Sequence, residues 1–230
     1  MYKKKPFFIV FEGVEGCGKS FQSKKLYDRL KKNKINSILT REPGGTKSSE
    51  LIRNLILKDY FSKNGKDKFD KYTDTLLYLA ARNEHIKNKI KPALLNKKVV
   101  ICDRFIDSTI AYQVHGKNVE LNFIKNIHKK ILGGVKPDIV FVLKVSQKSS
   151  ILRLKKRKTK NRYDNFKKSF YRKVQRSFIR LAKNKKNYFV LNSSSNDKSL
   201  ENNIFKIVNR FLKIKWFIRL FLTQKIQLIY

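Results

Sequence analysis

Short apolar runs alternate with longer stretches of helical spacing along most of the chain. Runs with the length of buried strands lie at residues 7–11, 37–40, 99–102, 139–142 and 188–191. Apolar residues recur at helical spacing over 19–32, 47–57, 73–90, 121–132, 149–156, 166–183 and 200–212. Continuous apolar strands separated by helices are typical of a parallel sheet that helices cover on both faces. The pattern therefore predicts an α/β fold.

The alternation is broken by no internal repeat and no long linker rich in proline, glycine or serine. We therefore expect one domain over residues 1–212, followed by an extension at 213–230 that mixes basic with large apolar residues. Its charges argue against a membrane-spanning helix, which needs about 20 predominantly apolar residues. We favour continuation of the last helix onto the core or a dimer partner. A basic amphipathic helix on a membrane surface is the alternative.

The chain is strongly basic, with 55 lysines and arginines against 17 acidic residues and a formal net charge of +38. Such a charge attracts polyanions, whether nucleotide phosphates, nucleic acid or anionic lipid. The lysines are scattered from one end of the chain to the other and do not form one stripe with interleaved aromatic residues. We therefore favour a compositional bias with solvated basic faces, and expect no specific nucleic-acid partner.

Cysteines and histidines give no sign of a metal centre or a redox site. Cys17 and Cys102 are far apart, and His85, His115 and His128 form no ligand spacing. A metal ion would therefore be bound by oxygen atoms. This cysteine usage suits a reducing cytosol, and the apolar run at 7–11 is too short for the core of a signal peptide. We expect a cytoplasmic protein.

A phosphate-binding loop follows the first predicted strand. Residues 13–20 read GVEGCGKS, which fits the pattern G-x-x-x-x-G-K-[ST] between a strand and a helix. Backbone N–H groups of such a loop point at phosphate oxygens, and the helix adds its positive N-terminal end. We expect Lys19 to reach the β- and γ-phosphates and Ser20 to help bind Mg²⁺. The residues predicted to bind ATP are Gly13, Val14, Glu15, Gly16, Cys17, Gly18, Lys19 and Ser20.

Cys17 has two interpretations within this loop. The N-terminus of a helix favours a thiolate, whereas a small side chain can also simply fill space. We favour the second.

The third predicted strand, at 99–102, ends in Asp103 and Arg104. Residues at the carboxyl ends of parallel strands face the ligand crevice of an open sheet. There Asp103 can orient Mg²⁺-bound water, and the planar fork of Arg104 suits a second phosphate. The chain lacks the base-reading N-K-x-D motif of a GTPase. These features favour a small-molecule kinase.

Four segments in the same order and at the same separation resemble thymidylate kinases. They read FEGVEGCGKS at 11–20, TREPGGT at 40–46, YLAAR at 78–82 and DRFIDSTIAYQ at 103–113. The resemblance covers about residues 5–212. It implies a three-layer P-loop NTPase fold, with a five-stranded parallel sheet flanked by helices and a mobile lid. It also implies phosphoryl transfer from ATP to dTMP with Mg²⁺, on the route to dTTP, in a homodimer.

The resemblance assigns acceptor-side roles to several residues. Glu15 matches the position near the acceptor sugar and the transferred phosphoryl group, and Arg41 the position near the acceptor monophosphate. Tyr78 matches the ring that stacks on thymine, more often Phe in the family, and Arg82 the residue that hydrogen-bonds the base.

Further positions of the third strand and the segment after it match the family. Arg104 would clamp the dTMP phosphate, and Asp103 would act on the magnesium side. Thr109 and Tyr112 match positions that line the thymine and deoxyribose pocket.

The basic segment at 153–164 matches the family's lid. Because the phosphate loop carries no basic residue before Gly18, the resemblance is to the bacterial type, in which lid arginines close over ATP. Arg157 and Arg162 are the best candidates, with Arg153 next. Lysine replaces arginine at nearby sites and lacks its bidentate fork, so which lid cation meets the γ-phosphate stays open. Asn161 also departs from the usual Asp.

Two alternatives remain. A P-loop kinase acting on other monophosphates or on nucleosides would share the phosphate loop, and only an acceptor panel separates it. A non-enzymatic nucleic-acid-binding protein would show steeply salt-dependent DNA binding without acceptor-dependent ADP release.

Overall fold

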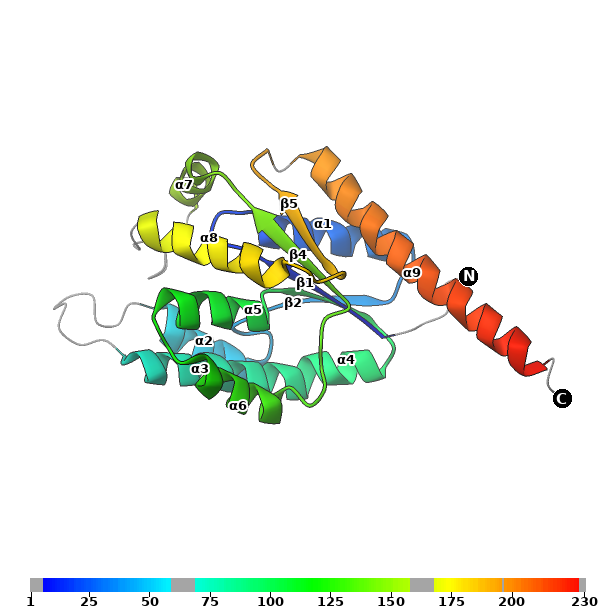
Figure 1. The fold of residues 1–230 in the computed structure, drawn as a ribbon, viewed down its shortest axis with the longest axis horizontal. Coiled ribbons are helices and arrows are strands. Elements are labelled where there is room, and N and C mark those ends of the chain that lie inside the picture. The colour runs from blue at the N-terminus through cyan, green and yellow to red at the C-terminus, as the bar shows by residue number, and fades with distance from the viewer. Residues whose placement is uncertain (1–5, 59–68, 158–167, 196, 228–230) are drawn as a thin grey trace.

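A five-stranded sheet forms the centre of the protein in a computed structural model, which describes residues 6–58, 69–157, 168–195 and 197–227, with side chains to 212. All neighbouring strands are parallel, in the order β2-β3-β1-β4-β5 (Figure 1). The strands are β1 (Phe7–Glu12), β2 (Ser37–Arg41), β3 (Val99–Asp103), β4 (Ile139–Lys144) and β5 (Tyr188–Asn192). The five predicted strands are therefore confirmed, each slightly longer at its carboxyl end.

The strands are continuous apolar runs because helices cover both faces of the sheet. Every residue of β1 is buried, and Ile9 pairs with Ile101 on one side and Ile139 on the other. The rings of Phe11 and Phe141 lie 5.2 Å apart on neighbouring strands. A strand buried on both faces shows no alternation of apolar and polar residues.

The helices form two layers around the sheet. Their bounds are α1 (Lys19–Lys32), α2 (Lys47–Leu57), α3 (Lys71–His85), α4 (Lys91–Leu95), α5 (Ile106–Thr109), α6 (Leu121–Ile131), α7 (Gln147–Lys155), α8 (Lys168–Ala182) and α9 (Lys198–Gln227). Figure 1 shows α1 and α9 on one face, with α8, α5, α3 and α4 on the other. Helices α2 and α6 pack on α3. This arrangement is the predicted three-layer fold.

The helix predicted over 73–90 has an irregular second half. It begins as α3, widens into a π-helical turn, η1 (Ile86–Ile90), and continues as α4. The N–H of Lys91 donates to the carbonyl of Ile86. Pro92 at the second position of α4 has no N–H to give. The backbone hydrogen bonds of the helix therefore widen from a four-residue to a five-residue spacing just before the proline.

Besides α4, which extends beyond the predicted end at residue 90, another helical segment was not predicted. Residues 106–116 form α5 followed by a π-helical stretch, η2 (Ile110–Gly116). The segment is rich in β-branched residues, which have low helix propensity. Its motif was recognised as part of the site, but its conformation was not.

The last helix does not end at the predicted domain boundary. α9 continues past residue 212 to Gln227 and extends away from the sheet (Figure 1). None of the helices that the structure describes is both long and apolar enough to cross a membrane. The side chains beyond 212, on which the two interpretations of the extension depend, lie outside the described part of the chain.

Candidate active site

A cavity of about 490 Å³ lies at the carboxyl ends of β1 and β3. Most of the predicted site residues line it: Glu15, Gly16, Gly18, Lys19, Ser20, Arg41, Tyr78, Arg82, Asp103, Arg104, Thr109, Tyr112 and Arg157. Gly13, Val14 and Cys17 are not among its lining residues and are buried in the loop. Arg162 lies outside the described residues. The structure therefore brings together side chains from motifs far apart in the sequence.

The phosphate loop needs glycine at its first position. Gly13 has φ of 140°, and a Cβ there would lie 2.6 Å from the carbonyl oxygen of Leu143 on β4. A side chain at this position would both strain the backbone and collide with the neighbouring strand. The loop therefore lies directly against the sheet, between β1 and α1.

Lys19 folds back over the loop that precedes it. Its ammonium donates to the carbonyl oxygens of Gly13 at 3.1 Å and Val14 at 2.8 Å, and the residue is almost fully buried. A buried ammonium needs such acceptors. Lysine and loop are therefore held as one unit at the cavity wall.

Cys17 lies beneath the same loop. Its side chain is fully buried, and burial raises the pKa of its thiol above the usual value, although Lys19 and Arg104 oppose the shift. The thiolate that a helix N-terminus favours is therefore not favoured here. Cys17 fills space, as we expected.

Ser20 and Asp103 meet at the cavity from different elements. The Ser20 hydroxyl, in the first turn of α1, donates to a carboxylate oxygen of Asp103, at the end of β3, over 2.5 Å. Both are hard oxygen donors, the type that Mg²⁺ prefers. The described residues contain no group of three or more His, Cys, Asp or Glu side chains able to hold a metal ion. A Mg²⁺ ion here would therefore take its other ligands from phosphate and water, as it usually does.

Arg104 is clamped between the phosphate loop and α5. Its guanidinium donates to Glu15 Oε1 at 2.7 Å, to the Gly13 carbonyl at 2.9 Å and to Ser108 Oγ at 3.0 Å. Tyr112 donates from its hydroxyl to the other carboxylate oxygen of Glu15. Arg104 has a positive φ of 75°, unusual for a residue with a side chain, which the surrounding contacts must stabilise.

A buried carboxyl group, Glu12, lies under this turn and was not singled out from the sequence. It accepts from the N–H groups of Phe105 at 2.8 Å and Ser108 at 3.2 Å, and from the Ser108 hydroxyl at 2.6 Å. Burial, together with Asp107, raises the pKa of Glu12 to about 8. Glu12 therefore fixes the start of α5 and, through it, the Arg104 turn.

Arg82 occupies a buried polar network rather than a helix surface. Its Nε donates to Glu42 Oε2 at 2.8 Å, one Nη donates to Thr109 Oγ1 at 2.7 Å, and the other donates to the Phe105 carbonyl at 2.9 Å. Glu42 is buried as well, and although burial opposes ionisation, Arg82 and His85 lower its pKa below the usual value. Arg82 is thus held in one orientation at the cavity wall.

Two histidines complete this network. His128 Nε2 lies 2.8 Å from Arg82 Nη1, and burial with the adjacent Arg82 lowers the pKa of His128 to about 3. The neutral imidazole therefore accepts from the guanidinium. His85 contacts Glu42 at 3.1 Å through Nδ1 and Thr40 at 2.6 Å through Nε2.

The segment TREPGGT at 40–46 forms a tight loop between β2 and α2. Gly45 has φ of 96°, and a Cβ there would lie 2.6 Å from both the ring of His85 and Thr40 Oγ1. The bond between Glu42 and Pro43 is cis. The glycine therefore lets the loop lie directly on the buried network.

Two arginines of this region reach the cavity. Arg41 donates to both carboxylate oxygens of Glu50 at 3.2 Å, and Arg53, on α2, donates to the Pro43 carbonyl at 2.5 Å. Arg53 was not predicted, although a basic residue within α2 after the TREPGGT motif was a visible signal. Burial and the neighbouring Arg41 lower its pKa.

Gln113 was also missed, although it ends the DRFIDSTIAYQ motif. It is buried at the cavity wall, and its amide nitrogen has no hydrogen-bond partner among the described residues. Buried polar groups are rarely left unpaired. The amide therefore offers a donor to a molecule in the cavity.

Arg153 connects the phosphate loop to the β5–α9 connection. Its guanidinium donates to the carbonyls of Gly16 at 3.1 Å, Ser193 at 2.8 Å and Ser194 at 2.6 Å. These three hydrogen bonds hold the Arg153 guanidinium against the phosphate loop. Arg157, which follows α7, lines the cavity, and the rest of the predicted lid, 158–164, lies outside the described residues.

Comparison with known proteins identifies a family. The family model "Thymidylate kinase" matches residues 11–204. The thymidylate kinase of Aster yellows witches'-broom phytoplasma (strain AYWB) is 40% identical over 210 residues, 90% of this chain and 96% of that protein. That of Wolbachia pipientis wMel is 42% identical over 178 residues, 76% of this chain and 84% of that protein.

A solved structure agrees. The crystal structure of thymidylate kinase from Ehrlichia chaffeensis aligns with a TM-score of 0.69 at 33% identity, covering 89% of this chain and 99% of that one. Sequence and architecture therefore lead to the same result: the chain belongs to the thymidylate kinase family.

Proposed function

We propose that this protein transfers the γ-phosphoryl group of ATP to dTMP, giving ADP and dTDP. The observation that carries the proposal is one cavity that joins a phosphate loop with Lys19 to a clamped Arg104, within a chain of the thymidylate kinase family. Phosphoryl transfer depends mainly on positioning and on neutralising charge on the phosphoryl oxygens. Two cationic groups in one cavity meet that need.

The phosphate loop binds ATP in this proposal. Its backbone N–H groups and the N-terminus of α1 receive the phosphates, while Lys19 leaves its loop carbonyls for the β- and γ-phosphate oxygens. Ser20 and Asp103 would hold Mg²⁺, supported by their 2.5 Å contact at the cavity. A Mg²⁺ ion held there would supply positive charge that neutralises the phosphate oxygens.

The opposite part of the cavity binds the acceptor. Arg104 holds the dTMP phosphate, and Arg41 and Arg53 supply further positive charge at the same cavity. Arg104 can meet a phosphate without moving far, because Glu15 and the Gly13 carbonyl fix its guanidinium.

Three side chains read the base. The ring of Tyr78 offers a stacking surface, Arg82 is oriented by Glu42, and the Gln113 amide offers a donor for a thymine carbonyl. Thr109 and Tyr112 line the sugar side of the pocket. A site built from donors favours a base that presents carbonyl oxygens over cytosine, which presents an amine.

The lid completes the site. We assign Arg157 and Arg162 to charge neutralisation on the ATP side, since the phosphate loop has no basic residue before Lys19. Closure of the lid excludes water and limits futile ATP hydrolysis. Arg153 is instead a positioning residue for the loop, supported by its hydrogen bond to Gly16.

We infer a homodimer through α2 and α3. These helices pack against each other and carry the exposed leucines Leu51, Leu55 and Leu76, which are 70%, 44% and 47% exposed. Apolar groups gathered on a surface mark interaction sites. Both cysteines are free and buried, which supports a reducing compartment, the cytoplasm.

Acceptor specificity tests the proposed reaction. ADP release is coupled to NADH oxidation with MgATP and dTMP, dUMP, UMP, CMP, GMP or AMP, and dTDP is identified by chromatography. We expect turnover to be fastest with dTMP. Folded protein that binds MgATP without forming dTDP would refute the proposal.

A further inference from the structure

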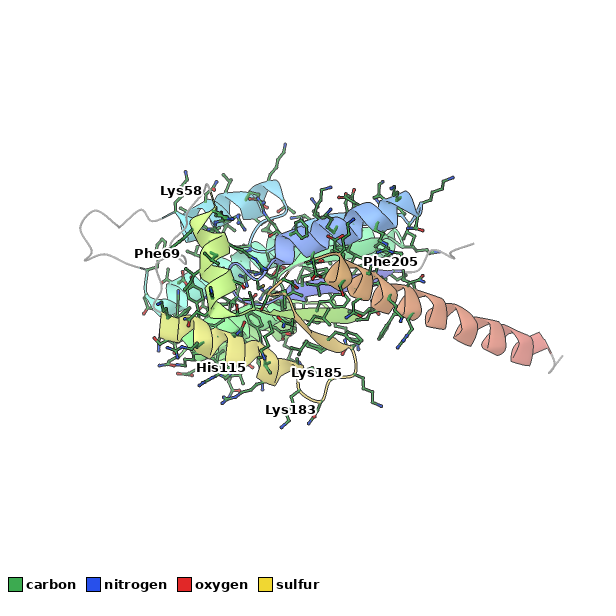
Figure 2. All side chains as sticks on the ribbon, turned by 90° about the horizontal axis from the view of Figure 1, so that it is seen from above. Lys58, Phe69, His115, Lys183, Lys185 and Phe205 are labelled. Atoms are coloured by element: carbon green, nitrogen blue, oxygen red, sulfur yellow. The ribbon has the colours of Figure 1, made fainter. Side chains whose placement is uncertain are left out.

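A second concave site lies between α8 and η2, away from the nucleotide cavity. It is a groove of about 390 Å³ lined by Arg172, Lys173, Arg176, Arg180, His115 and Ser177, among others. The two sites share no lining residue among those that the structure describes. Figure 2 shows His115 beside α8, against which η2 packs.

The three arginines form a row along one face of α8. They recur every fourth residue, so successive side chains are separated by about 6 Å along the helix axis. Within the described part of the chain, no hydrogen bond or ion pair engages any of the three guanidinium groups. Among the residues that the structure describes, no acidic side chain lines the groove. The row is thus a concentration of uncompensated positive charge.

The groove differs from the rest of the basic surface because its cations are mainly arginines. The sequence has 42 lysines and 13 arginines, so lysine is the usual cation of its surface. Arginine predominates where phosphates are expected, in the nucleotide cavity. Its planar fork binds a phosphate through two hydrogen bonds, which lysine cannot do. Three arginines in register are therefore not accounted for by the lysine bias.

A buried hydroxyl group gives independent support for a ligand. Ser177 is only 3% exposed, and its Oγ has no hydrogen-bond partner among the described residues. Leaving a buried hydroxyl unpaired is energetically unfavourable. An anionic oxygen in the groove would accept from it.

We propose that this groove binds the phosphate backbone of a nucleic acid strand, independently of base sequence. A row of three regularly spaced arginines can contact several phosphates of one strand at the same time. The exposed large apolar residues of the described chain lie outside α8 and η2. The described lining of the groove therefore contains none of the large apolar residues that insert into a membrane surface. The positive net charge of the chain attracts polyanions in general, and this groove would be the defined site at which they bind.

Fluorescence anisotropy with a labelled single-stranded DNA of about 20 nucleotides tests the proposal, because each lost phosphate contact lowers the salt slope by about 0.7. The test variant is Arg172→Gln/Arg176→Gln/Arg180→Gln. The matched control is Lys125→Gln/Lys129→Gln/Lys130→Gln, which removes the same charge from exposed positions of α6. We expect the slope of log Kd against log salt to fall by about 2 in the test variant alone.

Two further variants and a competitor distinguish the contributions of charge, guanidinium geometry and the Ser177 hydroxyl to oligonucleotide binding. Arg172→Lys/Arg176→Lys/Arg180→Lys keeps the charge and should still bind several-fold more weakly than the original chain. Ser177→Ala should weaken binding without changing the salt slope. Inorganic phosphate at equal ionic strength should compete poorly, since one phosphate spans one arginine.

Several results would overturn the proposal. They are no binding of the oligonucleotide, an equal loss in the α6 control, or an unchanged affinity after Ser177→Ala. Arginine-dependent flotation with phosphatidylserine vesicles, combined with unaltered DNA binding in the arginine variant, would also overturn it. Because binding is measured without substrates, these outcomes are independent of the kinase activity.

Discussion

Arg82 and Glu42 form a buried ion pair, with Arg82 Nε 2.8 Å from Glu42 Oε2 and both side chains at most 4% exposed. Arg82 lies on α3 and Glu42 in the loop after β2. The pair fixes a guanidinium that lines the nucleotide cavity. Since His85 and His128 bind the same pair, the base-binding side of the pocket is built on a polar core rather than on loose surface groups.

Glu42→Gln should lower both stability and the apparent affinity for dTMP. The variant leaves the Arg82 charge buried without its counter-ion, which costs on the order of 3 kcal/mol. We expect a lower urea midpoint and a raised KM for dTMP, while the KM for ATP stays within about twofold. Equal changes in both KM values would show that Glu42 supports the fold alone.

Lys19→Ala and Arg104→Ala should each nearly abolish turnover. Loss of a cation that neutralises the transferred phosphoryl group lowers the rate by about 10³–10⁵-fold. Steady-state kinetics give the size of the effect, and circular dichroism confirms that each variant is folded. Arg104→Lys is the matched control, because it keeps the charge but lacks the planar fork. Its turnover rate should lie between that of the original chain and that of Arg104→Ala. Near-normal activity in either alanine variant would remove that residue from the mechanism.

Gln113→Leu should weaken dTMP binding more than catalysis. The variant removes the amide group with its N–H donors and keeps a similar volume. A loss of about 1.4 kcal/mol corresponds to a tenfold higher KM. The measurement is a set of saturation curves for dTMP and dUMP. A normal KM with a reduced kcat would contradict a ground-state contact with the base.

His128 should remain neutral through the physiological range. Its pKa is lowered from 6.5 to about 3 in the folded protein. Between these values the unfolded chain binds a proton that the folded chain does not, so stability falls as the pH drops from 6.5 towards 3. His128→Asn should reduce this slope in urea unfolding. NMR of the imidazole Hε1 resonances should show that His128 does not titrate down to about pH 4, and titration near 6.5 would be inconsistent with the buried contact to Arg82.

Leu51→Lys/Leu55→Lys should yield a monomer if α2 and α3 form the dimer interface. Lysine charges introduced into an apolar contact would be buried without water or a counter-ion, which disfavours association. Light scattering after size-exclusion chromatography gives the mass of each variant. Leu95→Lys, at a residue that is 73% exposed on α4, is the control and should stay dimeric. A monomeric original chain would reject the proposed dimer outright.

The sheet and the phosphate loop could be predicted because their signals are local. Strands such as β1 are buried on both faces and appear as unbroken apolar runs, and the loop is one contiguous motif. The apolar run at 99–102 also marked Asp103 and Arg104, because they follow it directly at the carboxyl end of a strand. Local patterns therefore predicted which elements meet at the cavity.

Contacts between distant residues could not be predicted. Arg82 and Tyr78 have helical spacing typical of a surface pair, yet Arg82 is buried because its partners come from residues 42, 105, 109 and 128. The π-helical stretch η2, which carries Gln113, has weak helix propensity and forms against α8. Its conformation depends on tertiary packing, to which the local sequence gives no guide.

The carbonyl oxygen of Gly13 accepts from both Lys19 and Arg104, at 3.1 and 2.9 Å. The cations assigned to the two substrates therefore share a single acceptor. When ATP draws Lys19 away, that oxygen can bind Arg104 more strongly and hold it ready for the incoming monophosphate. Linkage makes the effect mutual, so occupancy of either half of the pocket would alter affinity at the other.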